Sequence, residues 1–315
     1  MRDLMLGVRD PHPTGRTAIQ RLLFVADAAV ADVDELPRAV RTVLDAAAEV
    51  HVLTPTLPER LSWLADDVDR FRHVADERLD TVLGHMFAIG AHADGLAGRG
   101  SIMLVVADAV AEFDPDHILI ALRGPEHANW QERRLTEHIQ ERFRLPVSSY
   151  AVDVGGHTST ADGPVLLCYD GSDDALHAIE RAGALFAGHD AIVVTGWRAA
   201  AVDALGSLAW SGITESRISF TDADRAVELA RRMAAEGAAI AQGAGMHAEP
   251  VAVEVTGRVA TTILEIADRH DAATIVLGSR GTAGLRSTLV GSVSNAVARH
   301  AHRPTLIVPR PVAPA

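Results

Sequence analysis

A run of apolar residues that leads through a glycine-rich loop into a helix restricts the fold of this chain more than any other feature. Residues Ala273-Thr-Ile-Val-Leu277 form the run, which is typical of a strand buried on both faces of a parallel sheet. The chain continues as Gly278-Ser-Arg-Gly-Thr-Ala-Gly-Leu-Arg-Ser-Thr-Leu-Val-Gly-Ser292, and helical patterning follows from Val293 to Arg299. A strand, a loop and a helix in this order predict an α/β fold.

The composition of this loop suits the binding of a phosphate group. Glycine lets the backbone approach an anion and present its N–H without a Cβ in the way. Gly291 and Ser292 stand where the next helix begins, so unpaired amides, the positive end of the helix dipole and a hydroxyl meet there. The loop therefore predicts an anion site.

Strand and helix patterns alternate along the whole chain, in two halves that follow one plan. Such alternation implies right-handed crossovers and a parallel sheet. The expected strands are 21–26, 49–53, 101–106, 117–121 and 146–152 in the first half, and 164–169, 191–195, 251–255, 273–277 and 305–308 in the second.

A segment rich in turn-forming and flexible residues separates the two halves. This segment and the strand pattern together predict four parts of the chain. They are an N-terminal extension at 1–18, a first domain at 19–153, a linker at 154–163 and a second domain at 164–315. With 315 residues, the chain is long enough for two such domains.

The first half has no equivalent of the glycine loop. Counting from the flanking strands places Arg123 and Arg133-Arg134 where the second half has the two ends of its loop. Only Gly124 remains between them, and it is followed by Pro125, which has no N–H to offer an anion. The first half is therefore expected to keep the fold and to lack the site.

The spacing G-x2-G-x9-G-[S/T], with its preceding strand and the terminal His302-Arg-Pro-Thr-Leu-Ile-Val-Pro309, closely resembles the nucleotide-binding signature of the universal stress protein family. Residues 164–310 resemble a standard domain of that family, and residues 19–153 resemble a degenerate copy. The resemblance implies two tandem Rossmann-like domains of the adenine-nucleotide hydrolase-like type, each a five-stranded parallel sheet with helices on both faces. It also implies that the last strands pair antiparallel, within the chain as a pseudo-dimer or between chains in a homodimer.

By the same resemblance the ligand is ATP, with or without Mg²⁺, bound beyond the carboxyl ends of the strands. Asp170 would lie beside the nucleoside, although an aspartate in this position often serves only as a turn or cap residue. The backbone near Gly196 would meet the adenine; this glycine stands where the family usually has a branched apolar residue. Gly278 and Gly281 would follow the ribose and phosphates.

The same resemblance assigns the β and γ phosphates to the start of the last helix. Gly291, Ser292 and the amide of Val293 would hold them.

Composition excludes several other classes. The formal net charge of −13 argues against a nucleic-acid partner. Apolar runs are too short to span a membrane and the N-terminus does not resemble a signal peptide, which predicts a cytoplasmic protein. The single cysteine, Cys168, lies in an apolar run and is expected to be a core residue rather than a nucleophile.

No catalytic constellation accompanies the loop. The chain has neither G-x-x-x-x-G-K-[ST] nor, after its first strands, G-x-G-x-x-G, and its histidines are scattered. The expected function is therefore an ATP-binding regulatory module with little or no hydrolysis. Two alternatives stay open. One is an ATP-using enzyme of the related fold, of the ligase or ATP pyrophosphatase type, although Asp170-Gly-Ser-Asp-Asp174 is not the Ser-Gly-Gly-x-Asp-Ser loop that such enzymes need. The other is a scaffold that has lost nucleotide binding.

Overall fold

The computed structural model describes residues 18–26, 36–55, 68–98, 101–123, 135–152, 161–198, 220–281 and 291–310. Several predicted features lie outside these ranges. They are residues 1–17 of the extension, residues 154–160 of the linker, the first-half positions Gly124 to Arg134, and residues 282–290 in the middle of the glycine loop.

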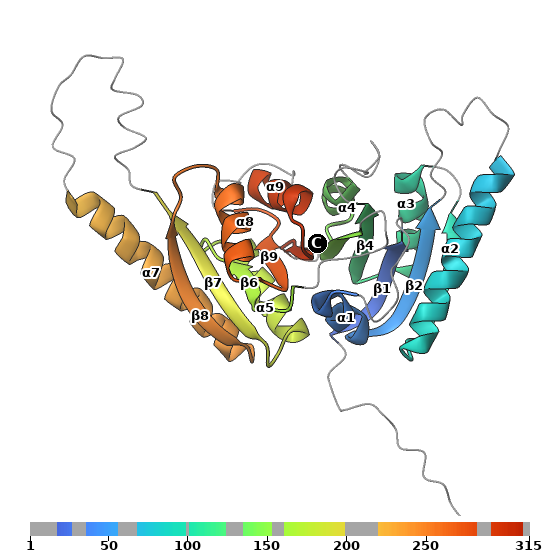
Figure 1. Ribbon diagram of the computed structural model, residues 1–315, viewed down its shortest axis with the longest axis horizontal. Coiled ribbons are helices and arrows are strands. Elements are labelled where there is room, and N and C mark those ends of the chain that lie inside the picture. Colours follow the sequence, from blue (N-terminus) through green and yellow to red (C-terminus); the bar gives the residue numbers. More distant parts are fainter. Residues whose placement is uncertain are drawn as a thin grey trace, which may run out of the picture.

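The strands in the described residues form one sheet, in the order β3-β2-β1-β4-β5-β10-β9-β6-β7-β8 (Figure 1). Their bounds are β1 Ile19–Ala26, β2 Ala47–Pro55, β3 Ala93–Gly98, β4 His117–Arg123, β5 Val147–Val152, β6 Val165–Cys168, β7 Asp190–Trp197, β8 His247–Glu254, β9 Thr274–Gly278 and β10 Thr305–Val308. Within each half the paired strands are parallel, and both halves have the same strand order.

Helices cover both faces of this sheet (Figure 1). Their bounds are α1 Arg38–Asp45, α2 Val68–Ala88, α3 Ile102–Phe113, α4 Leu135–Phe143, α5 Asp173–Leu185, α7 Phe220–Gly243, α8 Val259–Arg269 and α9 Ser292–His300. Helices α1, α2, α5 and α7 contribute to one hydrophobic core that continues through both halves. On the other face, α3 and α4 cover one core and α8 and α9 cover another. The predicted α/β fold is confirmed.

Central strands are apolar without interruption because both of their faces are covered. In β1, every residue from Leu22 to Ala26 is fully buried, although successive side chains point to opposite faces of the sheet. This is the pattern that the apolar runs of the sequence predict.

The two halves join edge to edge through their last strands. Strand β10 pairs antiparallel with β5, and Leu306 lies opposite Ser148 in the register. The neighbouring pairs are Thr305 with Ser149 and Ile307 with Val147, as expected for antiparallel strands. The prolines that precede the two strands, Pro146 and Pro304, are 158 positions apart, and so are Ser148 and Leu306 (306 minus 148), so these two residues hold equivalent places in the two halves. Equivalent residues therefore meet at the centre of the contact, as they do in the isologous interface of a twofold homodimer. Of the two predicted arrangements, the structure has the pairing within one chain.

An arginine of the second half extends this junction. Arg181 on α5 donates from Nη1 to the carbonyl of Ala18 at 2.7 Å, and its Nη2 lies 3.3 Å from Nδ1 of His117. Because a guanidinium only donates, Nδ1 must accept, and the proton of His117 sits on Nε2, which donates to Oγ of Ser148 at 2.9 Å. Burial, with the charge of Arg181, lowers the pKa of His117 to about 3, so this imidazole is neutral.

One expected strand of the first half is wrong. Residues 101–106, predicted as the third strand, begin helix α3, and the third strand is instead β3, Ala93–Gly98. A short apolar run has the same appearance in a buried helix and in a buried strand. The run continues at helical spacing, with Ile102, Val105, Val106 and Ala109 buried while Leu104 is 55% exposed. Strand β3 carries glycine and alanine instead of β-branched residues, so it gave no strand signal.

Candidate functional site

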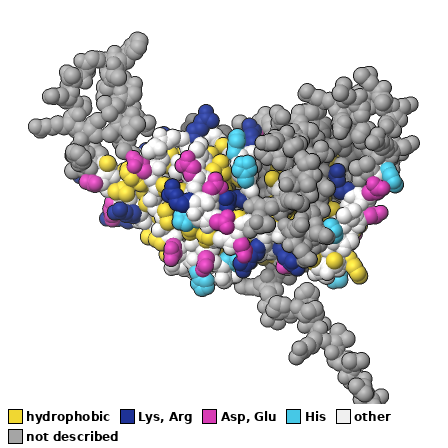
Figure 2. All heavy atoms as spheres, viewed as in Figure 1, with side chains coloured by type: hydrophobic (Ala, Val, Ile, Leu, Met, Phe, Trp, Pro, Cys, Tyr) yellow, Lys and Arg dark blue, Asp and Glu magenta, His cyan; other side chains and the backbone are white. Residues whose placement is uncertain are grey.

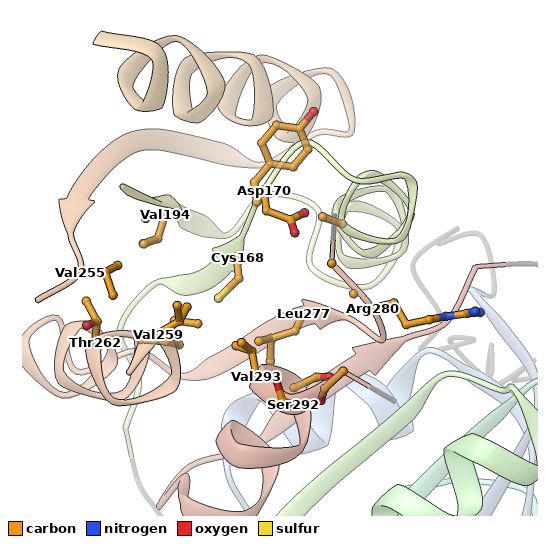
Figure 3. A pocket seen from close by; sticks show the side chains of 18 of the residues that line it. Cys168, Asp170, Val194, Val255, Val259, Thr262, Leu277, Arg280, Ser292 and Val293 are labelled. Atoms are coloured by element: carbon orange, nitrogen blue, oxygen red, sulfur yellow. The ribbon is translucent and has the colours of Figure 1, made fainter. Parts of the chain in front are cut away.

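A cavity of about 840 Å³ opens beyond the carboxyl ends of β6, β7 and β9, on the side of the sheet that α8 and α9 cover (Figure 3). Its volume lies within the range of about 300–1,000 Å³ that small-molecule sites occupy. All seven residues predicted for the site line it: Asp170, Gly196, Gly278, Gly281, Gly291, Ser292 and Val293. They come from four segments that are distant in the sequence, and the fold brings them together.

Asp170 follows strand β6 and has two roles in the structure. Its Oδ1 accepts a hydrogen bond from the amide of Ser172 at 3.0 Å, and Oγ of Ser172 in turn accepts from the amide of Ala175 at 3.2 Å as the N-cap of α5. Its Oδ2 lies 2.6 Å from the point where a Cβ of residue 281 would be. The carboxylate therefore shapes the turn and also lies at the cavity wall, directly against Gly281.

Protein packing explains Gly278 at least as well as a ligand does. A Cβ at this position would lie 2.6 Å from the carbonyl carbon of Asp174 and 2.8 Å from the amide nitrogen of Ala175. Strand β9 therefore ends directly against the first turn of α5, and any side chain larger than hydrogen would separate them.

The end of the loop is fixed before any ligand binds. The amide of Gly291 donates to the carbonyl of Ser279 at 2.7 Å, and Gly291 is the N-cap of α9. Its N–H is therefore already satisfied. Ser292 and Val293 occupy the first turn of the helix, where amides have no intrahelical acceptor, and both line the cavity (Figure 3). These two residues, more than Gly291, present donors to an anion.

The opposite end of the cavity is apolar, with a bare stretch of backbone. In β7 the carbonyl of Trp197 accepts from Val255 on the β8 side, and the carbonyl of Val194 accepts from Tyr169 on the β6 side. Successive peptide groups of a strand alternate in direction, so the N–H and C=O of Gly196 point to the β6 side, beyond the last paired residue, Cys168. Gly196 lines the cavity at this end. The side chains of Val194, Val255, Val259 and Thr262 line the same end (Figure 3).

The thiol of Cys168 and the phenol of Tyr169 stay protonated at neutral pH. Burial, with the nearby charge of Asp170, raises the pKa of the Cys168 thiol to about 12, so it is protonated at neutral pH. Burial and the hydrogen bond to Glu236 raise the pKa of Tyr169 to about 12. A protonated thiol is a poor nucleophile and a poor metal ligand, which agrees with the interpretation of Cys168 as a core residue.

Across the described ranges, no group of three or more His, Cys, Asp or Glu side chains is arranged to hold a metal ion. Within the same residues, no helix has the length and apolar character needed to cross a membrane.

Several residues at the site could not be predicted from the sequence, because their roles depend on contacts between distant segments. Asp174 on α5 accepts from Ser279 and Arg280, which follow it by more than 100 positions. Ser294 donates to the carbonyl of Ser279 from within α9. In the sequence each of these residues looks like an ordinary helix or loop residue, and no local pattern separates it from residues outside the site.

Fold and cavity together define a doubly wound α/β protein with a cavity at the carboxyl edge of parallel strands, beside a helix N-terminus, where ligands of such folds bind. The profile of the Universal stress protein family matches residues 163–309. A universal stress protein of Methanocaldococcus jannaschii is 30% identical over 150 residues, which cover 47% of this chain and 82% of that relative. The chain belongs to the universal stress protein family.

Other relatives are matched over a smaller share of their length. A universal stress protein of Mycobacterium tuberculosis is 32% identical over 103 residues, which span 33% of this chain and 31% of that relative. Among solved structures, a universal stress protein from Archaeoglobus fulgidus has a TM-score of 0.55 at 19% identity, and the alignment covers 93% of this chain and 97% of that one. A putative universal stress protein from Pseudomonas aeruginosa gives 0.54 at 16% identity, with 93% and 94% covered. These structures share the fold of both halves.

Proposed function

We propose that this protein is an ATP-binding regulatory module of the cytoplasm, with one nucleotide site per chain in the second half. One observation carries the proposal. The cavity has a helix N-terminus with a serine hydroxyl at one end and an apolar cleft with free backbone groups at the other. A nucleotide has the matching polarity, with phosphates at one end and a flat apolar base at the other.

The base end favours adenine over guanine. The N–H and C=O of Gly196 form one donor and one acceptor on the edge of β7, beyond the end of β6. Adenine offers an acceptor at N1 and a donor at N6, which complement this pair. Guanine offers a donor at N1 and an acceptor at O6, which place each hydrogen against a hydrogen and each lone pair against a lone pair. An unpaired buried polar group costs roughly 1–3 kcal/mol, so we expect a large difference between the binding free energies of ATP and GTP.

Among the described residues, the phosphate end supplies amide dipoles and a hydroxyl. Amides of Ser292 and Val293 and the hydroxyl of Ser292 lie at the positive end of α9. Arg280, which also lines the cavity, lies 3.6 Å from the carboxylate of Asp174.

Chemistry on the bound nucleotide is expected to be slow. A positioned general base typically contributes about 10²–10⁴-fold to a rate, and Asp170, the one carboxylate that lines the described cavity, belongs to the proposed nucleoside side. We therefore expect ATP hydrolysis far below ordinary enzyme rates of about 10 per second. The regulatory proposal would fail if purified protein reached such rates and Ser292→Ala abolished them.

The direct test has two steps. Mass spectrometry of protein denatured immediately after purification should release an adenine nucleotide, and calorimetry of nucleotide-free protein should give one ATP per chain, with GTP bound far more weakly. A protein that carries no nucleotide and binds none would be the scaffold alternative. Two equivalent ATP sites per chain would show that the first half also binds.

A further inference from the structure

We propose that Asp174 is a positioning residue for the phosphate end of the site, although it donates nothing to a ligand itself. It would act through Ser279 and Ser294, and we call these three residues together the loop anchor. This role rests on the proposed nucleotide function, and it concerns how the two described ends of the glycine loop are held relative to α5 and to each other.

The loop anchor begins at a buried carboxylate. Asp174, in the first turn of α5, is only 7% exposed. Its Oδ2 accepts the hydroxyl of Ser279 at 2.9 Å and the backbone amide of Arg280 at 3.1 Å, while Nε of Arg280 lies 3.6 Å away. Burying a carboxylate is costly unless hydrogen bonds compensate, and here the loop supplies them. The start of the glycine loop is therefore tied to α5.

The second part of the loop anchor ties the end of the loop to its start. The carbonyl of Ser279 accepts the amide of Gly291 at 2.7 Å and the hydroxyl of Ser294 at 3.1 Å. The same Ser294 hydroxyl also lies 3.0 Å from the carbonyl of Gly291. Ser279 thus bonds to α5 through its side chain and to the start of α9 through its carbonyl.

The consequence is a fixed position for the donors that would hold phosphate. Ser292 lies between Gly291 and Ser294, both bonded to the carbonyl of Ser279. Without Asp174, the segment would keep the bond from the Ser279 amide to the carbonyl of Val308 on β10 at 2.9 Å, but the peptide group between Ser279 and Arg280 would lose its hydrogen bond to α5. The start of α9, which is bonded to that peptide group, would then be held less firmly. A site whose donors are already in place spends less binding free energy on ordering them.

The variants distinguish this role from a simple effect of charge. Asp174→Asn keeps an oxygen that accepts from Ser279 and from the amide of Arg280, whereas Asp174→Ala removes both bonds. We expect ATP affinity within about threefold of wild type for the asparagine variant and a loss of about tenfold or more for the alanine variant. Asp173→Ala is the matched control, since it removes the same charge from the same helical turn. In the structure Asp173 pairs with Arg310 at 2.8 Å and not with the loop.

Two readouts separate positioning from general destabilisation. Adenosine, which lacks phosphates, should bind Asp174→Ala as it binds wild type, so only the preference for ATP over adenosine falls. In ligand-free protein, hydrogen exchange at the amides of Arg280 and Gly291 should accelerate in Asp174→Ala and not in Asp173→Ala.

Three outcomes overturn the proposal. If wild type binds ATP and Asp174→Ala binds it equally well, Asp174 does not position the loop. If both Asp174 variants bind ATP more tightly than wild type, the carboxylate acts by repelling phosphate. If wild type binds no ATP at all, the proposed function fails, and the positioning role fails with it.

Discussion

Asn295 and Glu137 meet across the junction of the two halves, where Nδ2 of Asn295 donates to Oε1 of Glu137 at 3.1 Å. The two residues are 158 positions apart, which is the offset that also relates Leu306 to Ser148 in the paired edge strands. Helices α4 and α9 therefore touch at equivalent positions, as the last strands do. Arg299 of α9 adds an ion pair to Glu137 at 3.6 Å. The junction has the geometry of a homodimer interface built into one chain.

This geometry predicts the behaviour of the second half alone. In a protein of residues 161–315, β10 loses its partner β5 and becomes an exposed edge, which is a template for pairing. We expect this half to dimerise through β10, with Leu306 opposite Leu306 of the second copy, because the offset places that residue at the twofold centre. Light scattering would measure the mass.

The matched control for this experiment is Leu306→Arg in the same fragment. Leu306 is 1% exposed in the full chain, and a charge at the centre of the paired strands should prevent dimerisation. A fragment that stays monomeric at every concentration, with a native circular dichroism spectrum, would contradict the expected pairing.

His117 predicts how stability depends on pH. Its pKa is lowered to about 3 in the folded protein, against 6.5 for the free side chain, so below pH 6.5 the unfolded chain binds a proton that the folded protein does not. The contribution that neutral His117 makes to the free energy of unfolding is fully present above pH 6.5 and is lost progressively as the pH falls toward about 3. Between pH 7.5 and pH 5 it should lower the free energy of unfolding by about 2 kcal/mol.

Denaturant titrations of wild type and His117→Gln at several pH values would check this. The glutamine variant cannot bind the proton, so its stability should fall less steeply over that range. Equal slopes for the two proteins would show that His117 titrates normally when folded, and the assignment of its neutral tautomer between Arg181 and Ser148 would then be wrong.

The sequence predicts those strands and site residues whose pattern lies within a short stretch of the chain, and it does not predict those that depend on contacts between distant segments. Continuous apolar runs such as Leu22–Ala26 reflect burial on both faces and identify their strands. Strand β3 is held by pairing with β2 and not by its own composition, so no local signal could find it. Glycines at the two ends of the loop line the cavity, as the sequence predicts, but Gly278 is explained by its contact with Asp174 and Ala175. That contact joins residues more than 100 positions apart, which no spacing rule reports.

Gly196 and Val255 should behave as a complementary pair. A Cβ at residue 196 would lie 2.9 Å from Cγ2 of Val255, so the valine fills the space that a side chain at 196 would take. Gly196→Val should crowd the base end of the cavity and weaken ATP binding by about tenfold, which corresponds to roughly 1.4 kcal/mol of overpacking. Val255→Ala should weaken it by removing two methyl groups from the cleft.

The double variant Gly196→Val with Val255→Ala should recover most of the affinity, because the new valine occupies the vacated space. Calorimetry of all four proteins gives the coupling free energy between the two positions. If the losses of ATP binding free energy in the two single variants simply add in the double variant, the two residues act independently. The base would then lie elsewhere in the cavity.

Ser292→Ala tests the phosphate end with the least disturbance of the protein. Gly291→Val is a less direct test, since a Cβ at 291 would already lie 3.1 Å from the carbonyl of Ser279, and the branched side chain would disturb the loop without any ligand. Ser292 is the first residue of α9, and its hydroxyl lies at the cavity wall. Removing one hydrogen bond to a charged phosphate should cost roughly 1.5–3 kcal/mol, which is about ten- to a hundredfold in ATP affinity.

The control for this variant is Arg134→Ala, which changes the position equivalent to Ser292 in the first half and should leave ATP affinity unchanged. Adenosine binding should also be the same in Ser292→Ala and wild type, because the base end is intact. If Ser292→Ala binds ATP as tightly as wild type while its circular dichroism spectrum is native, the phosphates do not lie at the start of α9. The orientation of the nucleotide in the cavity would then have to be reversed or abandoned.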